Sequence, residues 1–176
     1  GQLADAIEAK IWYDDNCDNI HQEGGEGEGE GGDVMLSIDT SGSMGGGSGS
    51  RMENAKAAAL GFVNNLNPDD RVGLVTFAGS GQLRQGLTFD HSLVEAFLQP
   101  GLSGITSGGR TMMDAGVDLA ADELTGNDRG VDQAIILLGD GQPNESARSG
   151  NNDVQNAIDA ADDAKAAGIT MFTIGL

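Results

Sequence analysis

The chain has 176 residues, of which 28 are acidic and 9 basic, so its formal net charge is −19. This charge argues against nucleic acid or an anionic membrane as the main partner, because both carry negative charge themselves. No run of 18 apolar residues occurs, which argues against a transmembrane segment within these residues, and the single cysteine, Cys17, excludes an intramolecular disulfide.

Aspartate accounts for 19 of the acidic residues and glutamate for 9, whereas lysine occurs only three times. This composition resembles that of proteins from salt-loving archaea, and it predicts a halophilic protein whose carboxylates repel one another least where salt screens them. Asp114, Asp118 and Asp122 illustrate the pattern, because they are spaced four apart on one predicted helix face. An acidic protein from an ordinary organism is the alternative interpretation.

The first part of the chain differs in pattern from the rest. Apolar residues alternate from Ile7 to Tyr13, which is the period-two signal of a half-buried strand, so we interpret residues 1–22 as the end of a β-rich module, such as a β-sandwich. Residues 23–32 then alternate glycine and glutamate. Such a segment cannot form a core and its charges repel, so it is predicted to be an extended linker.

The acidic cluster before the linker is a weak candidate for a calcium loop. Asp14, Asn16 and Asp18 have the D-x-N-x-D start of such a loop. Position twelve of the loop would be Gly25, so the usual bidentate glutamate is missing. A solvated acidic turn is the alternative interpretation.

From Asp33 onward, strands and helices are predicted to alternate. Short apolar runs predict strands at 34–38, 71–77, 134–138 and 169–174, and a polar alternating run after a Gly-Ser-Gly turn predicts an edge strand at 82–89. Helical spacing predicts helices at 52–66, 91–99, 113–124 and 154–164, the last with a buried face of Val154, Ile158, Ala161 and Ala164. This order predicts an α/β domain over residues 33–176, with a doubly wound, mostly parallel sheet and helices on both faces. Because the chain stops in a strand-like run, we expect the domain to be incomplete at its C-terminus.

Oxygen-bearing side chains follow two of the predicted strands and precede one helix. These side chains are Asp39, Ser41, Ser43, Thr111 and Asp140. In an open α/β sheet the ligand lies at the carboxyl ends of the central strands, so the three loops should meet there. Two carboxylates and three hydroxyls suit a hard cation, namely Mg²⁺, Mn²⁺ as a substitute, or Ca²⁺ in a looser cage. A polar turn that merely caps a helix is the structural alternative for the first loop alone.

The same residues carry a resemblance to a known family. Asp39-x-Ser41-x-Ser43, followed by Thr111 and Asp140, resembles the metal-ion-dependent adhesion site (MIDAS) of the von Willebrand factor type A (VWA) domain. The resemblance covers residues 33–176 and implies the Rossmann-like VWA fold. Two departures are Arg110 before the threonine and Gly139, where that family usually has threonine.

The resemblance implies a function in protein binding. In that family the protein side chains leave one position of the metal open, and an acidic residue of a partner protein fills it. The three hydroxyls would bind the metal directly, and the two carboxylates directly or through water. The expected protein is therefore a magnesium-dependent adhesion or interaction domain whose partner is a protein with an exposed acidic residue.

Two cellular settings remain open. VWA domains also occur in cytoplasmic proteins that scaffold or regulate an AAA+ ATPase, as in magnesium-chelatase-like proteins. However, residues 4–19 resemble a short stretch of secreted camelysin/TasA-like proteins, which are exported fibre or matrix components. That resemblance favours an extracellular or cell-surface protein, with assembly into a fibre or surface layer as a further expectation.

An enzyme is the less favoured class of function. The only histidines are His21, beside the linker, and His91, at a predicted helix start, and both read as surface residues. No nucleophile elbow, Walker A or H-E-x-x-H motif occurs. We therefore expect no catalytic activity.

Overall fold

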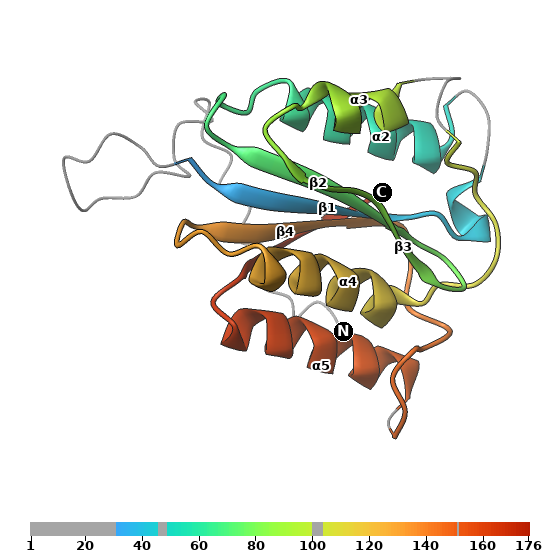
Figure 1. Cartoon of the computed structure of the whole chain (residues 1–176). Coiled ribbons are helices and arrows are strands. Elements are labelled where there is room, and N and C mark those ends of the chain that lie inside the picture. Colours follow the sequence, from blue (N-terminus) through green and yellow to red (C-terminus); the bar gives the residue numbers. More distant parts are fainter. Residues whose placement is uncertain (1–30, 46–48, 100–103, 151) are drawn as a thin grey trace.

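The computed structural model describes residues 31–45, 49–99, 104–150 and 152–176 (Figure 1). The strands are β1 (Asp33–Asp39), β2 (Arg71–Phe77), β3 (Gly81–Thr88), β4 (Gln133–Gly139) and β5 (Thr170–Gly175). The helices are the 3₁₀ turn η1 (Gly42–Met44), α2 (Arg51–Val63), α3 (Ser92–Leu98), α4 (Met113–Gly126) and α5 (Asp153–Ala166). The predicted α/β alternation is confirmed. The predicted N-terminal strand, the candidate calcium loop of Asp14, Asn16 and Asp18, and residues 23–30 of the predicted linker lie outside the described residues.

The strands form one sheet in the order β3-β2-β1-β4-β5. β1 pairs in parallel with β2 and β4, and β4 pairs in parallel with β5. β3 is antiparallel to β2 at the edge of the sheet, as its polar alternation predicted. Because the other four strands are parallel, their C-terminal ends all lie along one side of the sheet and their N-terminal ends along the opposite side. We call the edge at which β1 and β4 end the carboxyl edge, and the opposite one the amino edge.

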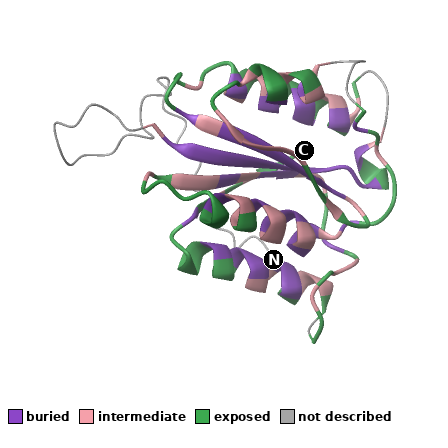
Figure 2. Ribbon diagram, viewed as in Figure 1, coloured by how far each residue is buried: buried purple, intermediate pink, exposed green. Residues whose placement is uncertain are grey.

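The apolar runs of the central strands are explained by helices on both faces of the sheet, with α2 and α3 on one side and α4 and α5 on the other (Figure 1). Met35 and Ile135 belong to the core cluster with α4 and α5, whereas the next residues along, Leu36 and Ile136, belong to the cluster with α2 and α3. Figure 2 shows the resulting burial of β1 along its whole length. The sheet is therefore the rigid support for the loops at its carboxyl edge.

Helix α4 packs very closely on the sheet at Gly116. The Ser37 hydroxyl of β1 donates a hydrogen bond to the Gly116 carbonyl at 3.1 Å. A Cβ atom at position 116 would lie 2.9 Å from that hydroxyl oxygen and would overlap the ring of Phe77. The glycine thus permits the short distance that fixes the start of α4, and with it the loop before α4.

The interpretation of Asp114, Asp118 and Asp122 as a row of repelling surface charges is wrong for two of the three. Asp114 is buried and accepts the backbone N–H of Arg148 at 2.8 Å. The Arg148 guanidinium bonds both oxygens of Asp118, at 2.6 and 3.0 Å, and also reaches Asp163 at 2.8 Å. Hydrogen bonds to Asp118 and Asp163 raise the pKa of Arg148, so the guanidinium stays charged. The positive charge that pairs with these carboxylates comes from Arg148 in the loop after β4, and a helix pattern alone cannot reveal such a partner.

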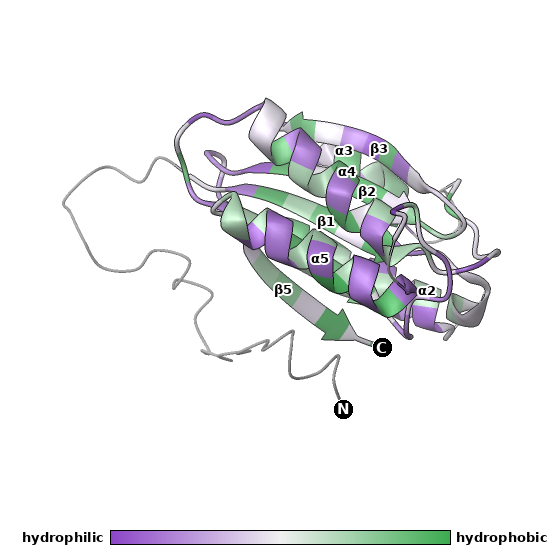
Figure 3. Cartoon of the chain, turned by 90° about the horizontal axis from the view of Figure 1, so that it is seen from below, coloured by the Kyte–Doolittle hydropathy of each residue, from purple (hydrophilic) through white to green (hydrophobic). Residues whose placement is uncertain are grey.

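Helix α5 also differs from its predicted face. Val154 and Ile158 are only partly buried, whereas the closest packing is made by four alanines. They are Ala157, Ala160, Ala161 and Ala164. Small side chains let α5 lie against α4 and β4, and they leave its outer face to the hydrophilic residues visible in Figure 3. The prediction is therefore correct for Ala161 and Ala164 and wrong for Val154 and Ile158, because the buried face is turned toward Ala157 and Ala160.

A buried ion cluster fixes the amino edge. Asp33, the first residue of β1, is fully buried and receives hydrogen bonds from Arg71 (2.6 and 2.9 Å) and Arg129 (2.9 Å). Both guanidinium groups also lie over the exposed ring of Phe89, at 6.0 and 5.4 Å from its centroid. Burial alone would raise the pKa of Asp33, but hydrogen bonds and charge from the two arginines outweigh it and lower the pKa. The start of β1 is thereby tied to β2 and to the loop before β4.

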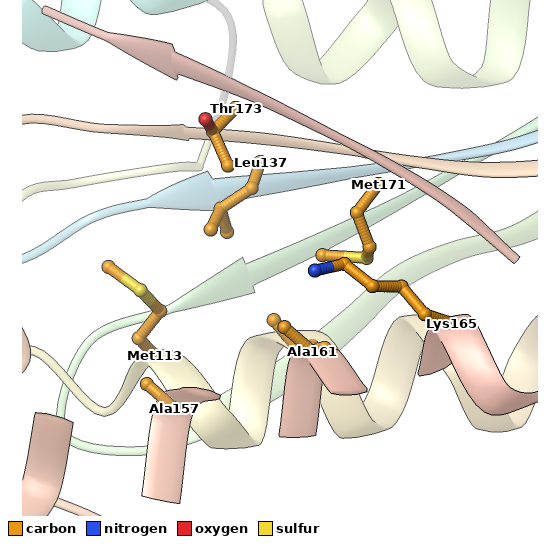
Figure 4. A pocket seen from close by; sticks show the side chains of 8 residues that line it. Met113, Leu137, Ala157, Ala161, Lys165, Met171 and Thr173 are labelled. Carbon is orange, nitrogen blue, oxygen red and sulfur yellow. The ribbon is translucent and has the colours of Figure 1, made fainter. Parts of the chain in front are cut away.

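The interior offers little room for a ligand. A cavity of about 10 Å³ lies between α4, α5 and the last two strands, and Figure 4 shows its lining of Met113, Leu137, Met171 and neighbouring side chains. That volume is about the size of one water molecule. Within the described residues, no helix has both the length and the apolar character needed to span a bilayer. The surface loops are therefore the place to look for a functional site.

Candidate functional site

The three predicted loops meet at the carboxyl edge of the sheet, at the end where η1 follows β1 in Figure 1. Backbone hydrogen bonds join them. The N–H of Gly108 donates to the carbonyl of Thr40 at 2.8 Å, and the N–H of Gly42 donates to the carbonyl of Gly109 at 3.1 Å. The carbonyl of Thr111 accepts from the N–H of Asn144 at 3.1 Å. The loops after β1, before α4 and after β4 thus form one connected surface.

Asp39 ends β1 and is fully buried. Its Oδ1 accepts the backbone N–H of Ser41 at 2.7 Å, which holds the turn closed. Its Oδ2 is buried and has no hydrogen-bond partner among the described residues. A buried carboxylate oxygen without a partner is costly, and a bound cation is one of the few groups that would compensate it.

Ser41, Ser43 and Asp140 form a hydrogen-bonded chain beside Asp39. The Ser43 hydroxyl donates to Asp140 Oδ1 at 2.8 Å, and the hydroxyl oxygens of Ser41 and Ser43 lie 3.1 Å apart. Because the single proton of Ser43 is given to Asp140, Ser41 must be the donor to Ser43. The protons therefore point along the chain toward Asp140, and lone pairs of both serines stay available for a cation.

Thr111 is buried at 3% exposure in the loop that precedes α4. Its backbone N–H donates to the side-chain oxygen of Asn144 at 2.9 Å, while its carbonyl accepts the N–H of Asn144. Asn144 therefore clamps the threonine to the loop that carries Asp140. This clamp was not predicted, because an asparagine in a loop gives no sequence signal of the partner it will have 33 residues away.

Arg51, the first residue of α2, is a second feature that the sequence did not reveal. Its Nη1 donates to Asp140 Oδ2 at 2.9 Å and to the Ser43 carbonyl at 3.2 Å. The arginine side chain is 54% exposed, whereas that of Asp140 is 1% exposed. A surface guanidinium thus covers one of the two carboxylates of the site.

The electrostatics of the site favour a positive ligand. Burial, and secondarily the charge of Asp140, raises the pKa of Asp39, so the ionised form of this carboxylate is less favourable in the folded chain than in water. Within the described residues, no group of three or more His, Cys, Asp or Glu side chains could hold a metal. A cation here would depend on hydroxyl oxygens as well as two carboxylates, which is the donor chemistry of Mg²⁺, Mn²⁺ or Ca²⁺ rather than of zinc or copper. The residues present fit such an ion.

Gly139 lies next to Asp39, with little room for a side chain between them. A Cβ atom at position 139 would lie 3.3 Å from the Cβ of Asp39 and 3.4 Å from its Oδ2. A side chain at this position would therefore make a tight contact with Asp39. The glycine also removes the hydroxyl that a threonine would place next to the unpartnered oxygen. This departure leaves the site intact and makes Asp39 more dependent on an external partner.

A second network of hydrogen bonds holds the loop after β4 against helices α4 and α5. The Ser146 hydroxyl and the Arg148 N–H both donate to Asp114 Oδ2, at 2.6 and 2.8 Å, and the Asn156 amide donates to Ser146 at 2.7 Å. This network joins the loop to α4 and α5. The spacing of these residues along the chain gave no hint of it.

His91, the histidine among the described residues, lies away from this edge. His91 follows β3 at the amino edge, where its Nε2 lies 2.9 Å from the carbonyl oxygen of Asp70. His21 lies outside the described residues.

Comparisons with known proteins agree with this fold. The model of the von Willebrand factor type A domain family matches residues 33–176. A solved structure of an aerotolerance-related membrane protein from Bacteroides fragilis is 30% identical, with a TM-score of 0.66, and the match covers 82% of this chain and 67% of that one. BatB from Bacteroides thetaiotaomicron is 29% identical, with a TM-score of 0.67 and coverage of 82% and 66%.

A third similar structure is the vWF domain of the type V pili tip protein Mfa5 from Porphyromonas gingivalis. It is 25% identical with a TM-score of 0.59, and the match covers 67% of this chain and 40% of that chain. The present chain thus spans between two-fifths and two-thirds of these three solved chains. No curated protein matches it.

Proposed function

The chain belongs to the von Willebrand factor type A domain family, and from this premise we propose that it is a divalent-metal-dependent protein-binding domain of a secreted or cell-surface protein. The observation that carries the proposal is the unpartnered, buried Oδ2 of Asp39, next to the chain of donors Ser41, Ser43 and Asp140. A cation bound at this point would satisfy a group that the fold leaves unsatisfied.

Five side chains would hold the metal. Ser41, Ser43 and Thr111 would bind it directly, and Asp39 and Asp140 directly or through water. Mg²⁺ is the proposed ion, with Mn²⁺ or Ca²⁺ as substitutes. When bound, the metal supplies an electrophilic position that an incoming carboxylate can fill. The protein itself contributes the fixed hydroxyls, because β1 and the Asn144 clamp hold them in place before the partner arrives.

The proposed partner is a protein that presents an acidic residue. The pilus-tip neighbour favours a protein partner or assembly into a fibre, and together with the membrane-protein neighbour it favours the cell surface over the cytoplasmic alternative with an AAA+ ATPase. The donor set at the carboxyl edge contains hydroxyls and carboxylates, which suits binding rather than catalysis, and we propose no enzymatic activity.

Calorimetric titration with Mg²⁺ and Mn²⁺ tests the metal site. We expect the wild-type chain to bind one ion and the Asp39→Asn variant to lose at least about tenfold in affinity, because the variant removes one of two anionic ligands and keeps the shape. Asp122→Asn is the matched control, since Asp122 is exposed on α4 and far along the helix from the site. Equal heats for the wild type and Asp39→Asn would overturn the metal site.

A further inference from the structure

The exposed rim of the carboxyl edge carries an arginine whose charge the fold does not use. Arg110 is exposed, and within the part of the chain that the structure describes its side chain donates only to the Asn144 carbonyl, from Nη1 at 3.4 Å. No carboxylate of the described residues lies within ion-pair distance of it. Arg51, Arg71, Arg129 and Arg148, in contrast, all form ion pairs. Arg84 also forms no ion pair, but it is partly buried and its Nε donates to the Thr76 hydroxyl at 2.8 Å, so among the described residues Arg110 is the exposed arginine without an ion pair.

The position of Arg110 is fixed by the residues on both sides of it. The carbonyl of Gly109, which has a φ of 83°, accepts the N–H of Gly42. The N–H of Thr111 donates to the Asn144 side chain. Arg110 therefore leaves the surface between two anchored residues, one position before a proposed metal ligand. Its guanidinium contacts the Asn144 carbonyl, and so lies on the same loop that clamps Thr111 and carries Asp140.

We propose that Arg110 is a second binding point for the partner, and that it pairs with a further carboxylate of the same acidic segment whose first carboxylate completes the metal shell. The inference rests on the proposed function. A guanidinium can bind a carboxylate through two parallel hydrogen bonds, so this contact would select segments with two acidic residues close together over segments with one. The partner class is thus an acidic protein segment with at least two neighbouring carboxylates.

Glu145 provides an opposing charge on the same rim. Its N–H lies 3.4 Å from the Thr111 carbonyl, and its carboxylate is near Gly79, where a Cβ atom would be 3.7 Å from Oε2. A carboxylate on this loop would oppose the approach of an acidic segment. Removal of its charge should therefore tighten binding, while removal of the Arg110 charge should weaken it.

Fluorescence anisotropy with two labelled peptides tests the inference. Both are Gly-rich nonapeptides of equal length, one with a single glutamate and the other with two glutamates two residues apart. In excess Mg²⁺ we expect the wild type to bind the two-glutamate peptide about three- to tenfold more tightly, a preference that shrinks as KCl is added. Arg110→Gln should abolish the preference and leave the affinity for the one-glutamate peptide within about twofold.

Two further variants test the sign of the charge effect and the need for a guanidinium. Glu145→Gln should increase affinity for the two-glutamate peptide, and Arg110→Lys should retain only part of the preference, because an ammonium cannot make the paired contact. Lys165→Gln is the matched control, since it removes the same charge from α5 near the amino edge. An unchanged preference in Arg110→Gln would overturn the inference alone. If neither peptide bound in Mg²⁺, or if binding persisted in a chelator, the proposed function would fail and the inference with it.

Discussion

Arg51 holds the carboxylate that a metal at the carboxyl edge would need. Its Nη1 lies 2.9 Å from Asp140 Oδ2, while the other oxygen of Asp140 accepts the Ser43 hydroxyl. Asp39 forms no ion pair with any described residue, and its Oδ2 has no hydrogen-bond partner among them. The two carboxylates of the site are therefore unequal: one is compensated by a surface arginine and the other awaits a ligand.

This inequality predicts the effect of Arg51→Gln. Removal of a nearby positive charge should strengthen Mg²⁺ binding about two- to fivefold at low salt, because the guanidinium and the metal compete for Asp140 and the arginine is half exposed to water. The advantage should disappear in molar KCl. Calorimetric titration of the variant beside Lys165→Gln measures it. Weaker metal binding by Arg51→Gln would mean that the arginine orients Asp140 instead of competing for it.

At the scale of elements, the contact between α4 and the sheet places Thr111. Helix α4 begins two residues after Thr111, so any shift of the helix moves the threonine loop. Gly116 lets the helix approach Ser37 and Phe77 within one turn of its start. The precision of the site thus depends on a glycine that has no polar role in it.

Two glycine-to-alanine substitutions separate this packing role from helix propensity. Gly61→Ala in α2 has nothing within 4 Å of the added Cβ, so it should stabilise the protein by about 0.5–1 kcal/mol. Gly116→Ala gains the same propensity but overlaps Phe77, and should destabilise by about 1–3 kcal/mol. Urea unfolding of both variants in one buffer decides the matter. If the two were equally stable, α4 would have room that the structure does not give it.

Element order was predictable from the sequence, whereas several side-chain partners were not. The apolar runs and the Gly-Ser-Gly turn gave the strands, the edge position of β3 and the carboxyl edge at which the proposed metal ligands lie. Arg148 could not be assigned to Asp118, because the two are 30 residues apart and meet only after the sheet has formed. The Asn144 clamp and the Arg51 contact were missed for the same reason. The periodicity of apolar residues identifies the buried face of a helix or strand, but the partners of loop residues are decided by the tertiary structure.

At the scale of the whole molecule, the two edges of the sheet have opposite roles. The carboxyl edge carries the unsatisfied Asp39 and the charged rim, while the amino edge is closed by the fully compensated Asp33 with Arg71 and Arg129. The chain also enters the domain at the amino edge, where the N–H of Gly32 donates to Asp70. Strands of seven residues separate the edges by about 20 Å. The compensated ion cluster and the proposed binding site thus lie at opposite ends of the same sheet.

The amino-edge cluster should give stability a defined dependence on pH. The pKa of Asp33 is lowered in the folded state from its usual value of 3.8. The carboxylate therefore contributes its full stabilisation above pH 3.8, and the contribution is lost as the pH falls through the lowered pKa of the folded state. Asp33→Asn should cost about 2 kcal/mol at neutral pH, because it leaves two arginines without their shared anion.

The difference between the wild type and Asp33→Asn should then shrink as the pH falls below 3.8, because the unfolded chain takes up a proton on Asp33 there while the folded chain, with its lowered pKa, does so only at lower pH. Urea unfolding across that range measures it, with Asp122→Asn as the control, because Asp122 is exposed and should show no such trend. A gap that stayed constant to the lowest pH would mean that shape rather than charge holds the cluster. Asp33 and Asp39 lie at opposite ends of β1. Asp33→Asn should therefore leave the affinity for Mg²⁺ unchanged wherever the protein remains folded. A metal titration of this variant thus separates damage to the fold from damage to the site.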